Sequence, residues 1–170
     1  MTSDARDHLL DWLGNAHAME KQAETLLGTA AKRIEHYPEL RARIEQHIEE
    51  TRGQADMLES RIQSLGGDTS TIKDFMGSAM ATFHALGNAL QEDEVVKVAG
   101  FSYAFEHFEI AQYRTLISAA EAIGDTETAR VCSEILKQEE AMAQWCLENL
   151  EPTVLRFLER SATPDQTAKR

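Results

Sequence analysis

At residues 105–113 the sequence reads FEHFEIAQY, and this stretch is the most informative in the chain. It lies inside an apolar-periodic segment, residues 101–123, which contains no Gly or Pro and therefore predicts a helix. Spacings of three and four residues place one stripe on a single face of that helix: Ser102, Glu106, Glu109, Tyr113, Leu116 and Ala120. Because the stripe becomes apolar toward its C-terminal end, we expect this face to be buried with two carboxylates on it.

Buried carboxylates require compensation. An isolated ionised carboxylate is very costly in an apolar interior, so such groups take up a proton, pair with a cation or bind a metal ion. Glu106 and Glu109 therefore predict partner groups on other helices. The alternative reading, which applies to any single Glu in an Ala- and Leu-rich helix, is a solvated surface position.

Composition favours a single all-helical domain. The chain has 170 residues, 42% of them apolar, with three prolines and nine glycines. A net charge of −12 and a pI of about 4.9 argue against binding to nucleic acid or to anionic membrane surfaces. No apolar run approaches the roughly 20 residues of a membrane span, and the N-terminus lacks the pattern of a signal peptide. We expect a cytoplasmic protein that binds neither membranes nor nucleic acid.

Four main helices are predicted, over residues 6–36, 38–65, 94–123 and 126–149. A shorter helix is expected within residues 71–90 of the long connection, and another over residues 152–160. We predict one domain over residues 1–160 and a polar, disordered tail over residues 161–170. Two helical hairpins joined by a long crossover are typical of an all-α, ferritin-like four-helix bundle.

A weak internal repeat relates the two hairpins. When the chain is aligned with itself at an offset of 89 residues, Glu20 falls on Glu109 and Glu50 falls on Glu139. The alignment places one carboxylate from each main helix at a corresponding depth. On the second helix, the inward position falls on Glu50 or on Thr51.

Carboxylates that converge from four helices can hold two cations, and oxygen ligands with some imidazole suit iron or manganese. The Glu-x-x-His pattern of common di-iron bundles is incomplete, because Gly53 follows Glu50 and Met142 follows Glu139 at that spacing. Histidines stand one turn earlier instead. We predict four core ligands, Glu20, Glu50, Glu109 and Glu139, and three supplementary ones, Glu106, His47 and His17.

Several assignments stay open at this point. Glu49 replaces Glu50, or Glu140 replaces Glu139, if the helical phase differs by one residue. His107, on the flank of its helix, is interpreted as a structural hydrogen-bonding group. Tyr113, one turn after Glu109, is either a neighbour of the ligands or part of the core.

Five short segments, at residues 19–22, 47–51, 105–111, 113–117 and 139–140, resemble the bacterial YciE/YciF family of ferritin-like stress-response proteins. The similarity extends over about residues 6–150. The resemblance implies a ferritin-like bundle, a di-metal centre and a homodimer.

The functional hypothesis is a di-iron or di-manganese carboxylate protein that acts as a ferroxidase or reacts with dioxygen or peroxide in a stress response. Two iron or manganese ions would be its cofactors. Turnover beyond metal binding is left open, and no catalytic residue is assigned. The alternative hypothesis is a metal-free, dimeric helical stress protein that acts as an interaction module.

Overall fold

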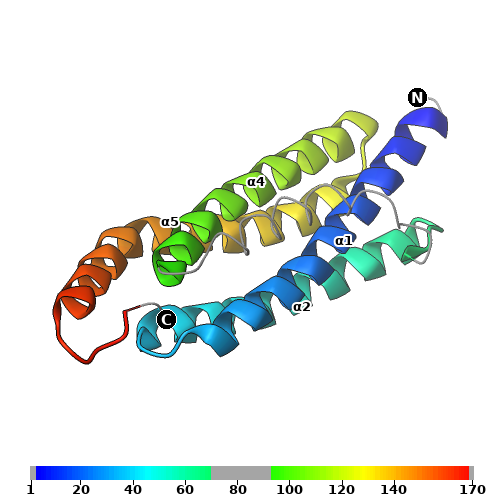
Figure 1. Cartoon of the computed structure of the whole chain (residues 1–170). Coiled ribbons are helices and arrows are strands. Elements are labelled where there is room, and N and C mark those ends of the chain that lie inside the picture. The colour runs from blue at the N-terminus through cyan, green and yellow to red at the C-terminus, as the bar shows by residue number, and fades with distance from the viewer. Residues whose placement is uncertain (1–2, 70–92, 169–170) are drawn as a thin grey trace.

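The computed structural model describes residues 3–69 and 93–168. They form four helices, α1 (Ser3–Arg33), α2 (Pro38–Ser64), α4 (Glu94–Ile123) and α5 (Thr126–Ala162), and these ranges contain no strand. Helices α1 and α2 pair along their length, as do α4 and α5, and the two hairpins lie against each other (Figure 1). The predicted all-α four-helix bundle is therefore confirmed. The helix predicted within residues 71–90 lies outside the described residues.

Helix ends follow the turn chemistry of the sequence. Helix α4 ends at Gly124, whose φ of 79° is in the left-handed region that glycine adopts without strain. The next residue, Asp125, caps α5, because its side chain accepts a hydrogen bond from the backbone N–H of Thr128. Helix α2 begins with Pro38, whose missing N–H costs nothing in the first turn.

Helix α1 differs from the predicted range of 6–36, since it covers Ser3–Arg33. The reversal into α2 uses residues 34–37, and Tyr37 adopts a φ of −126° and a ψ of 70° ahead of Pro38. The chain thus leaves the helix three residues earlier than the apolar pattern indicates.

Helix α5 continues through Pro152 to Ala162, so the predicted end at residue 149 and the separate helix over 152–160 are wrong. Proline inside a helix removes one backbone hydrogen bond and crowds the preceding turn. Packing on both sides offsets this cost, because Trp145 before the proline and Phe157 after it contact the same apolar cluster. Tertiary packing therefore overrides the local helix-breaking residue.

Residues 161 and 162, which the sequence analysis assigns to the tail, complete α5. The chain then turns back toward the start of α2. There the Tyr37 hydroxyl donates a hydrogen bond to the carbonyl of Ala168 at 2.6 Å. Arg160 Nε donates to the carbonyl of Thr167 at 2.9 Å. The division of the chain into a domain and a tail stays a prediction.

Two apolar clusters fill the described part of the bundle. One contains Leu13, Leu58, Tyr113 and Ile135, and the other contains Ile34, Ile44 and Val95. Along each helix, a buried polar side chain lies between the residues that build one cluster and those that build the other: Glu20 on α1, Gln54 on α2, Glu109 on α4 and Glu139 on α5. The interior is thus layered, with a polar layer between two apolar ones.

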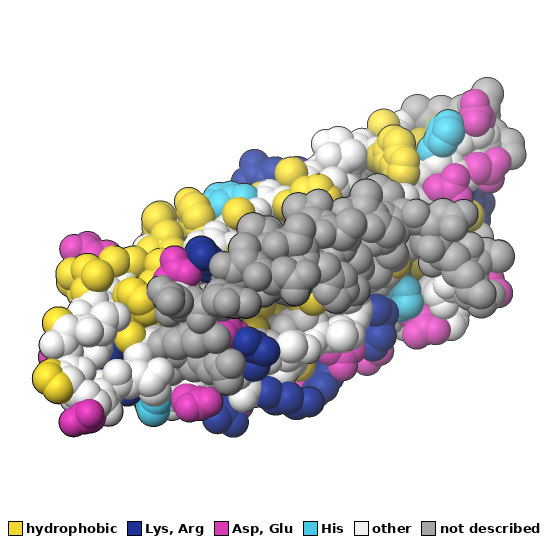
Figure 2. All heavy atoms as spheres, viewed as in Figure 1, with side chains coloured by type: hydrophobic (Ala, Val, Ile, Leu, Met, Phe, Trp, Pro, Cys, Tyr) yellow, Lys and Arg dark blue, Asp and Glu magenta, His cyan; other side chains and the backbone are white. Residues whose placement is uncertain are grey.

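The molecule also exposes large apolar side chains. Figure 2 shows one face, on which apolar side chains gather toward the end where α5 extends beyond α4. On α5 itself the exposed large apolar residues are Leu147, Val154, Leu155 and Leu158. None of the helices in the described ranges is both long and apolar enough to cross a membrane.

Candidate metal centre

Four side chains from three helices meet in the polar layer. One potential ligand atom from each of His47 on α2, Glu106 and Glu109 on α4, and Glu139 on α5 lies within 4.8 Å of the others. These residues are at most 1% exposed. We call this group, together with Glu20 on α1, the carboxylate cluster, because the charge of Glu20 acts on Glu109 and Glu139.

The helical periodicity explains why these residues face inward. On α4, Glu106 and Glu109 share the predicted stripe with Tyr113 and Leu116, and all four are buried. On α5, Glu139 is one turn from Ile135, which is fully buried. Burial of the apolar neighbours therefore carries the carboxylates into the core.

Two buried neighbours hold individual carboxylates by hydrogen bonds. The hydroxyl of Tyr113 donates to Oε1 of Glu20. The amide of Gln54 on α2 donates to Oε1 of Glu139, and also to Oε1 of Gln138 at 2.9 Å. Each of these contacts links a helix of one hairpin to a helix of the other.

The imidazole of His47 lies between an outer and an inner group of carboxylates. Its Nδ1 is 2.8 Å from Oε2 of Glu50. Its Nε2 is 3.3 Å from Oε2 of Glu106 and 3.5 Å from Oε2 of Glu139, which are ion-pair distances without the alignment of a hydrogen bond.

Burial governs the ionisation of the carboxylates. It raises the pKa of Glu20 from 4.5 to about 7, against the opposing effect of the Tyr113 hydrogen bond. Burial also raises the pKa of Glu109 well above its ordinary value, and the charge of Glu20 adds to the shift. The pKa of Glu139 is raised in the same way by burial and by contact with Glu106. The cluster is therefore costly in its ionised form.

His47 and Glu50 shift each other in opposite directions. Burial alone would lower the pKa of His47, but the nearby carboxylates of Glu106 and Glu50 outweigh it and raise the pKa to about 10. The hydrogen bond with His47 is the main cause that lowers the pKa of Glu50 to about 2. His47 and Glu50 thus form an ion pair that links the buried cluster to the partly exposed side of α2.

The donor set fits divalent iron or manganese. Within residues 3–69 and 93–168, five buried oxygen atoms find no hydrogen-bond partner: Oε2 of Glu20, Oε1 of Gln54, Oε2 of Glu106, Oε1 of Glu109 and Oε2 of Glu139. Unpartnered buried polar atoms are rare in native proteins and point to a missing ion or water. Carboxylate oxygens with one imidazole are donors that these metals accept.

The structure brings together five of the seven side chains predicted as ligands: Glu20, Glu106, Glu109, Glu139 and His47. It does not bring in Glu50 or His17. The Glu50 side chain is 23% exposed and contacts His47 and Arg43. His17 is half-buried, and the charged groups acting on it, Glu59, Lys21 and Asp56, all lie outside the cluster.

Of the alternative positions left open by the sequence, the structure places Glu139 in the cluster and Glu140 and Glu49 outside it. Glu140 is an exposed partner of Arg114, and Glu49 is an exposed partner of Arg52. His107 packs edge-on against the ring of Tyr103 at 4.5 Å rather than facing the cluster.

Sequence reasoning missed Gln54 as a functional residue. It is fully buried and bonds to Glu139, and its carbonyl oxygen has no hydrogen-bond partner among the described residues. An amide carries no charge, so it lacks the buried-charge signal that identifies the carboxylates. Its place on the inward stripe of α2, seven residues after His47, is the signal that identifies it.

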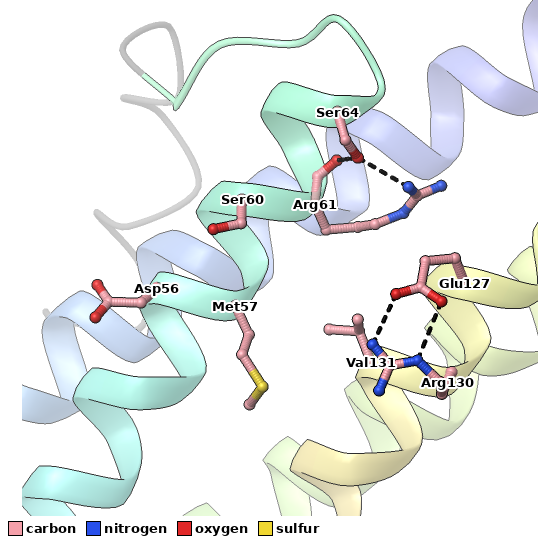
Figure 3. Close-up of a pocket in the computed structure, with 8 residues that line it drawn as sticks. All are labelled: Asp56, Met57, Ser60, Arg61, Ser64, Glu127, Arg130 and Val131. Carbon is pink, nitrogen blue, oxygen red and sulfur yellow. Dashed lines mark hydrogen bonds and ion pairs between the residues drawn. The ribbon is translucent and has the colours of Figure 1, made fainter.

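A separate pocket of about 480 Å³ lies between α2 and α5, toward the turn at residues 124–125. Its arginines are already paired, and Figure 3 shows Arg130 with Glu127 and Arg61 with Ser64. Arg61 also donates a hydrogen bond to Asp125, which is not drawn there. Both arginines that line this pocket are therefore already engaged by neighbouring side chains.

Comparison with known protein families shows to which family the chain belongs. The family described as "Domain of unknown function (DUF892)" matches residues 4–159. The chain belongs to this family. Protein YciF of Escherichia coli, a curated relative of this DUF892 chain, is 28% identical over 141 residues, which cover 79% of the chain and 83% of YciF. The resemblance to the YciE/YciF family is thus confirmed.

Solved structures share the fold of this DUF892 protein. A Xanthomonas campestris protein has a TM-score of 0.81 and 45% identity, covering 95% of this chain and 100% of that one. The E. coli stress protein YciF has a TM-score of 0.77 and 23% identity, covering 91% and 99%. A Bacillus anthracis structure described as ferritin-like, diiron-carboxylate has a TM-score of 0.72 and 20% identity, covering 88% and 99%. The last two matches establish the ferritin-like fold alone.

Proposed function

We propose that this protein binds two iron or manganese ions in the carboxylate cluster and uses them to react with dioxygen or peroxide, acting as a ferroxidase in a stress response. The observation that carries the proposal is the set of unpartnered oxygens that converge in the buried polar layer. The stress role is proposed from the description of its relative YciF as a stress protein.

Charge balance supports two divalent ions. Glu20, Glu106, Glu109 and Glu139 together carry four negative charges when ionised, and two divalent cations carry four positive charges. Without a metal ion, the buried carboxylates either take up protons or repel one another. A bound cation lowers this cost because its positive charge balances theirs. Bound iron or manganese would supply one-electron chemistry with dioxygen or peroxide.

The protein's own residues orient and enclose the site. Tyr113 and Gln54 each hold one carboxylate in place, which leaves the other oxygen directed away from that bond. The apolar clusters on either side exclude bulk water and so strengthen electrostatic interactions within the layer.

The test of metal binding is an anaerobic calorimetric titration of chelator-treated protein with Mn²⁺ and with Fe²⁺, followed by elemental analysis. We expect two ions per chain. We expect Glu109→Gln to lower the affinity at least about tenfold, whereas Glu121→Gln, an exposed site on the same helix, leaves it unchanged. Absence of binding to the wild-type protein would refute the proposal.

Turnover is tested separately, by following Fe²⁺ oxidation after addition of dioxygen or hydrogen peroxide to the loaded protein. We expect oxidation faster than in protein-free buffer and slower in Glu109→Gln. A protein that binds the ions but matches the buffer rate would be a metal-binding protein without ferroxidase activity.

Assembly and location complete the proposal, in which the protein is a cytoplasmic homodimer. The exposed apolar residues of α5, Leu147, Val154, Leu155 and Leu158, supply surface that a partner would cover. The same surface favours the second candidate function, a dimeric interaction module without metal. Light scattering tests the dimer, and the metal titration separates the two candidates.

A further inference from the structure

Glu50 lies beside the carboxylate cluster and holds the outer edge of the His47 ring. Its Oε2 is 2.8 Å from Nδ1 of His47 and accepts a hydrogen bond from Nη1 of Arg43 at 3.1 Å. Its Oε1 accepts from Nε2 of Gln46 at 2.8 Å. Three donors on the same helix thus fix the Glu50 carboxylate.

The bond to His47 determines which ring nitrogen faces the cluster. An ionised carboxylate only accepts hydrogen bonds, so the shared proton lies on Nδ1 of His47. The opposite nitrogen, Nε2, then points toward Oε2 of Glu106 and Oε2 of Glu139. His47 is 1% exposed, so rotation of the ring would require rearrangement of the surrounding core.

We propose that Glu50 is a positioning residue, which holds the imidazole of His47 with Nε2 directed into the cluster and does not itself bind the ions. This inference rests on the proposed function, because it assigns the role of Glu50 at the same site. It also replaces the sequence-based prediction of Glu50 as a core ligand. Arg43 and Gln46 support Glu50 from the partly exposed side of α2.

A positioning role and a ligand role predict different results for a conservative pair of variants. Glu50→Ala removes the acceptor, and loss of such an outer partner typically costs about 10–100-fold in metal affinity. Glu50→Gln keeps an oxygen that can accept from Nδ1, so it should retain most of the affinity. A direct carboxylate ligand would instead lose its charge in both variants.

The first experiment titrates chelator-treated protein with Mn²⁺ under anaerobic conditions. We expect Glu50→Ala to bind the same number of ions as wild type with about 10–100-fold lower affinity. Glu49→Ala, the exposed neighbouring position, is the matched control and should bind as wild type does. A lower number of bound ions in Glu50→Ala, or equal losses in Glu50→Ala and Glu50→Gln, would overturn the inference.

A double-mutant cycle with His47→Ala shows whether Glu50 acts through His47. If it does, Glu50→Ala has no further effect on Mn²⁺ affinity once His47 is replaced. Full additivity of the two losses would contradict the inference.

A second measurement does not depend on metal. Nitrogen-15 NMR of the histidine rings in metal-free protein should show a hydrogen-bonded Nδ1–H of His47 in wild type and in Glu50→Gln, but not in Glu50→Ala. If wild-type protein binds no Mn²⁺, the proposed function fails while this measurement still tests the positioning of His47. An unchanged His47 signal in Glu50→Ala would overturn the positioning role.

Discussion

The hydroxyl of Tyr113 on α4 donates a hydrogen bond to Oε1 of Glu20 on α1, across 93 positions of the chain. Both side chains are fully buried. The bond joins the two hairpins at the level of the carboxylate cluster, and Oε2 of the same Glu20 has no hydrogen-bond partner in the part of the chain that the structure describes. Tyr113 is therefore a neighbour of the cluster as well as part of the core, which answers the question left open by the sequence.

Replacing Tyr113 by Phe should lower the free energy of unfolding of the metal-free protein by about 1–3 kcal/mol, because a buried carboxylate oxygen loses its donor. Urea unfolding followed by circular dichroism measures the effect. Tyr103→Phe, at a half-buried position on the same helix, is the control and should change stability by less than about 0.5 kcal/mol. Equal losses in the two variants would show that the Tyr113 hydroxyl has no special role.

Glu109→Gln should leave the metal-free protein as stable as wild type or more stable near pH 8, because it removes a charge that burial and Glu20 both disfavour. Metal reverses the order, since a ligand that binds only the folded state stabilises it by about 2.7 kcal/mol at a hundredfold excess over its dissociation constant. Melting temperatures with and without Mn²⁺ measure both effects. A variant that melts lower without metal yet responds to Mn²⁺ as wild type does would make Glu109 a structural residue.

The stability of the metal-free protein should depend on pH through Glu20. Its pKa rises from 4.5 in the unfolded chain to about 7 in the folded one, so the folded state retains a proton between these values. The Glu20 contribution is fully present below pH 4.5 and is lost as pH rises through about 7, a change on the order of 3 kcal/mol. Glu20→Gln should remove this part of the pH dependence in urea unfolding at pH 4.5–8. Parallel curves for the two proteins would contradict the assignment.

Asp125 should be a strong stabilising residue far from the cluster. It caps α5, accepts hydrogen bonds from Thr128, and pairs with Arg61 through both oxygens, at 2.8 and 2.7 Å. Asp125→Ala should cost about 1–3 kcal/mol, because the helix loses its cap and Arg61 loses its partner. Asp125→Asn keeps the cap and should cost less.

Glu127→Ala, in the same turn but exposed, should cost under about 1 kcal/mol. Thermal unfolding of the three variants checks this ranking.

The architecture was predictable because strong local patterns agree with the packing. The stripe on α4 contains no Gly or Pro, and all six of its predicted members are buried. Gly124 and Asp125 locate the turn between α4 and α5 in sequence and in structure. Pro152 led to a wrong prediction of the end of α5. Trp145 before the proline and Phe157 after it pack against the same apolar cluster, and local sequence rules do not reveal such contacts.

The site was predictable only where helix phase was unambiguous. On α2 the buried residues include His47, Thr51, Gln54 and Leu58, which follow the spacing of four, three and four along one face. Glu50 is rotated away from that face, although the internal repeat aligns it with Glu139. A repeat preserves position along an axis, but a small rotation of one helix about its own axis changes which side chain enters the core. His47 and Glu50 pair at a spacing of three residues on one helix, and the rotation of that helix determines that His47 is buried while Glu50 stays partly exposed.

The distribution of the cluster between the two hairpins also bears on the order of folding events. Each hairpin closes across a short connection, at residues 34–37 or 124–125, so its helices can pair early through contacts local in sequence. Glu106, Glu109 and Glu139 belong to the second hairpin, and they keep their hydration until the first hairpin covers them with Glu20 and His47. The electrostatic cost of burying these carboxylates therefore arises when the two hairpins dock against each other. An ion held at this junction would oppose the separation of the hairpins, and we expect it to slow unfolding more than it accelerates refolding.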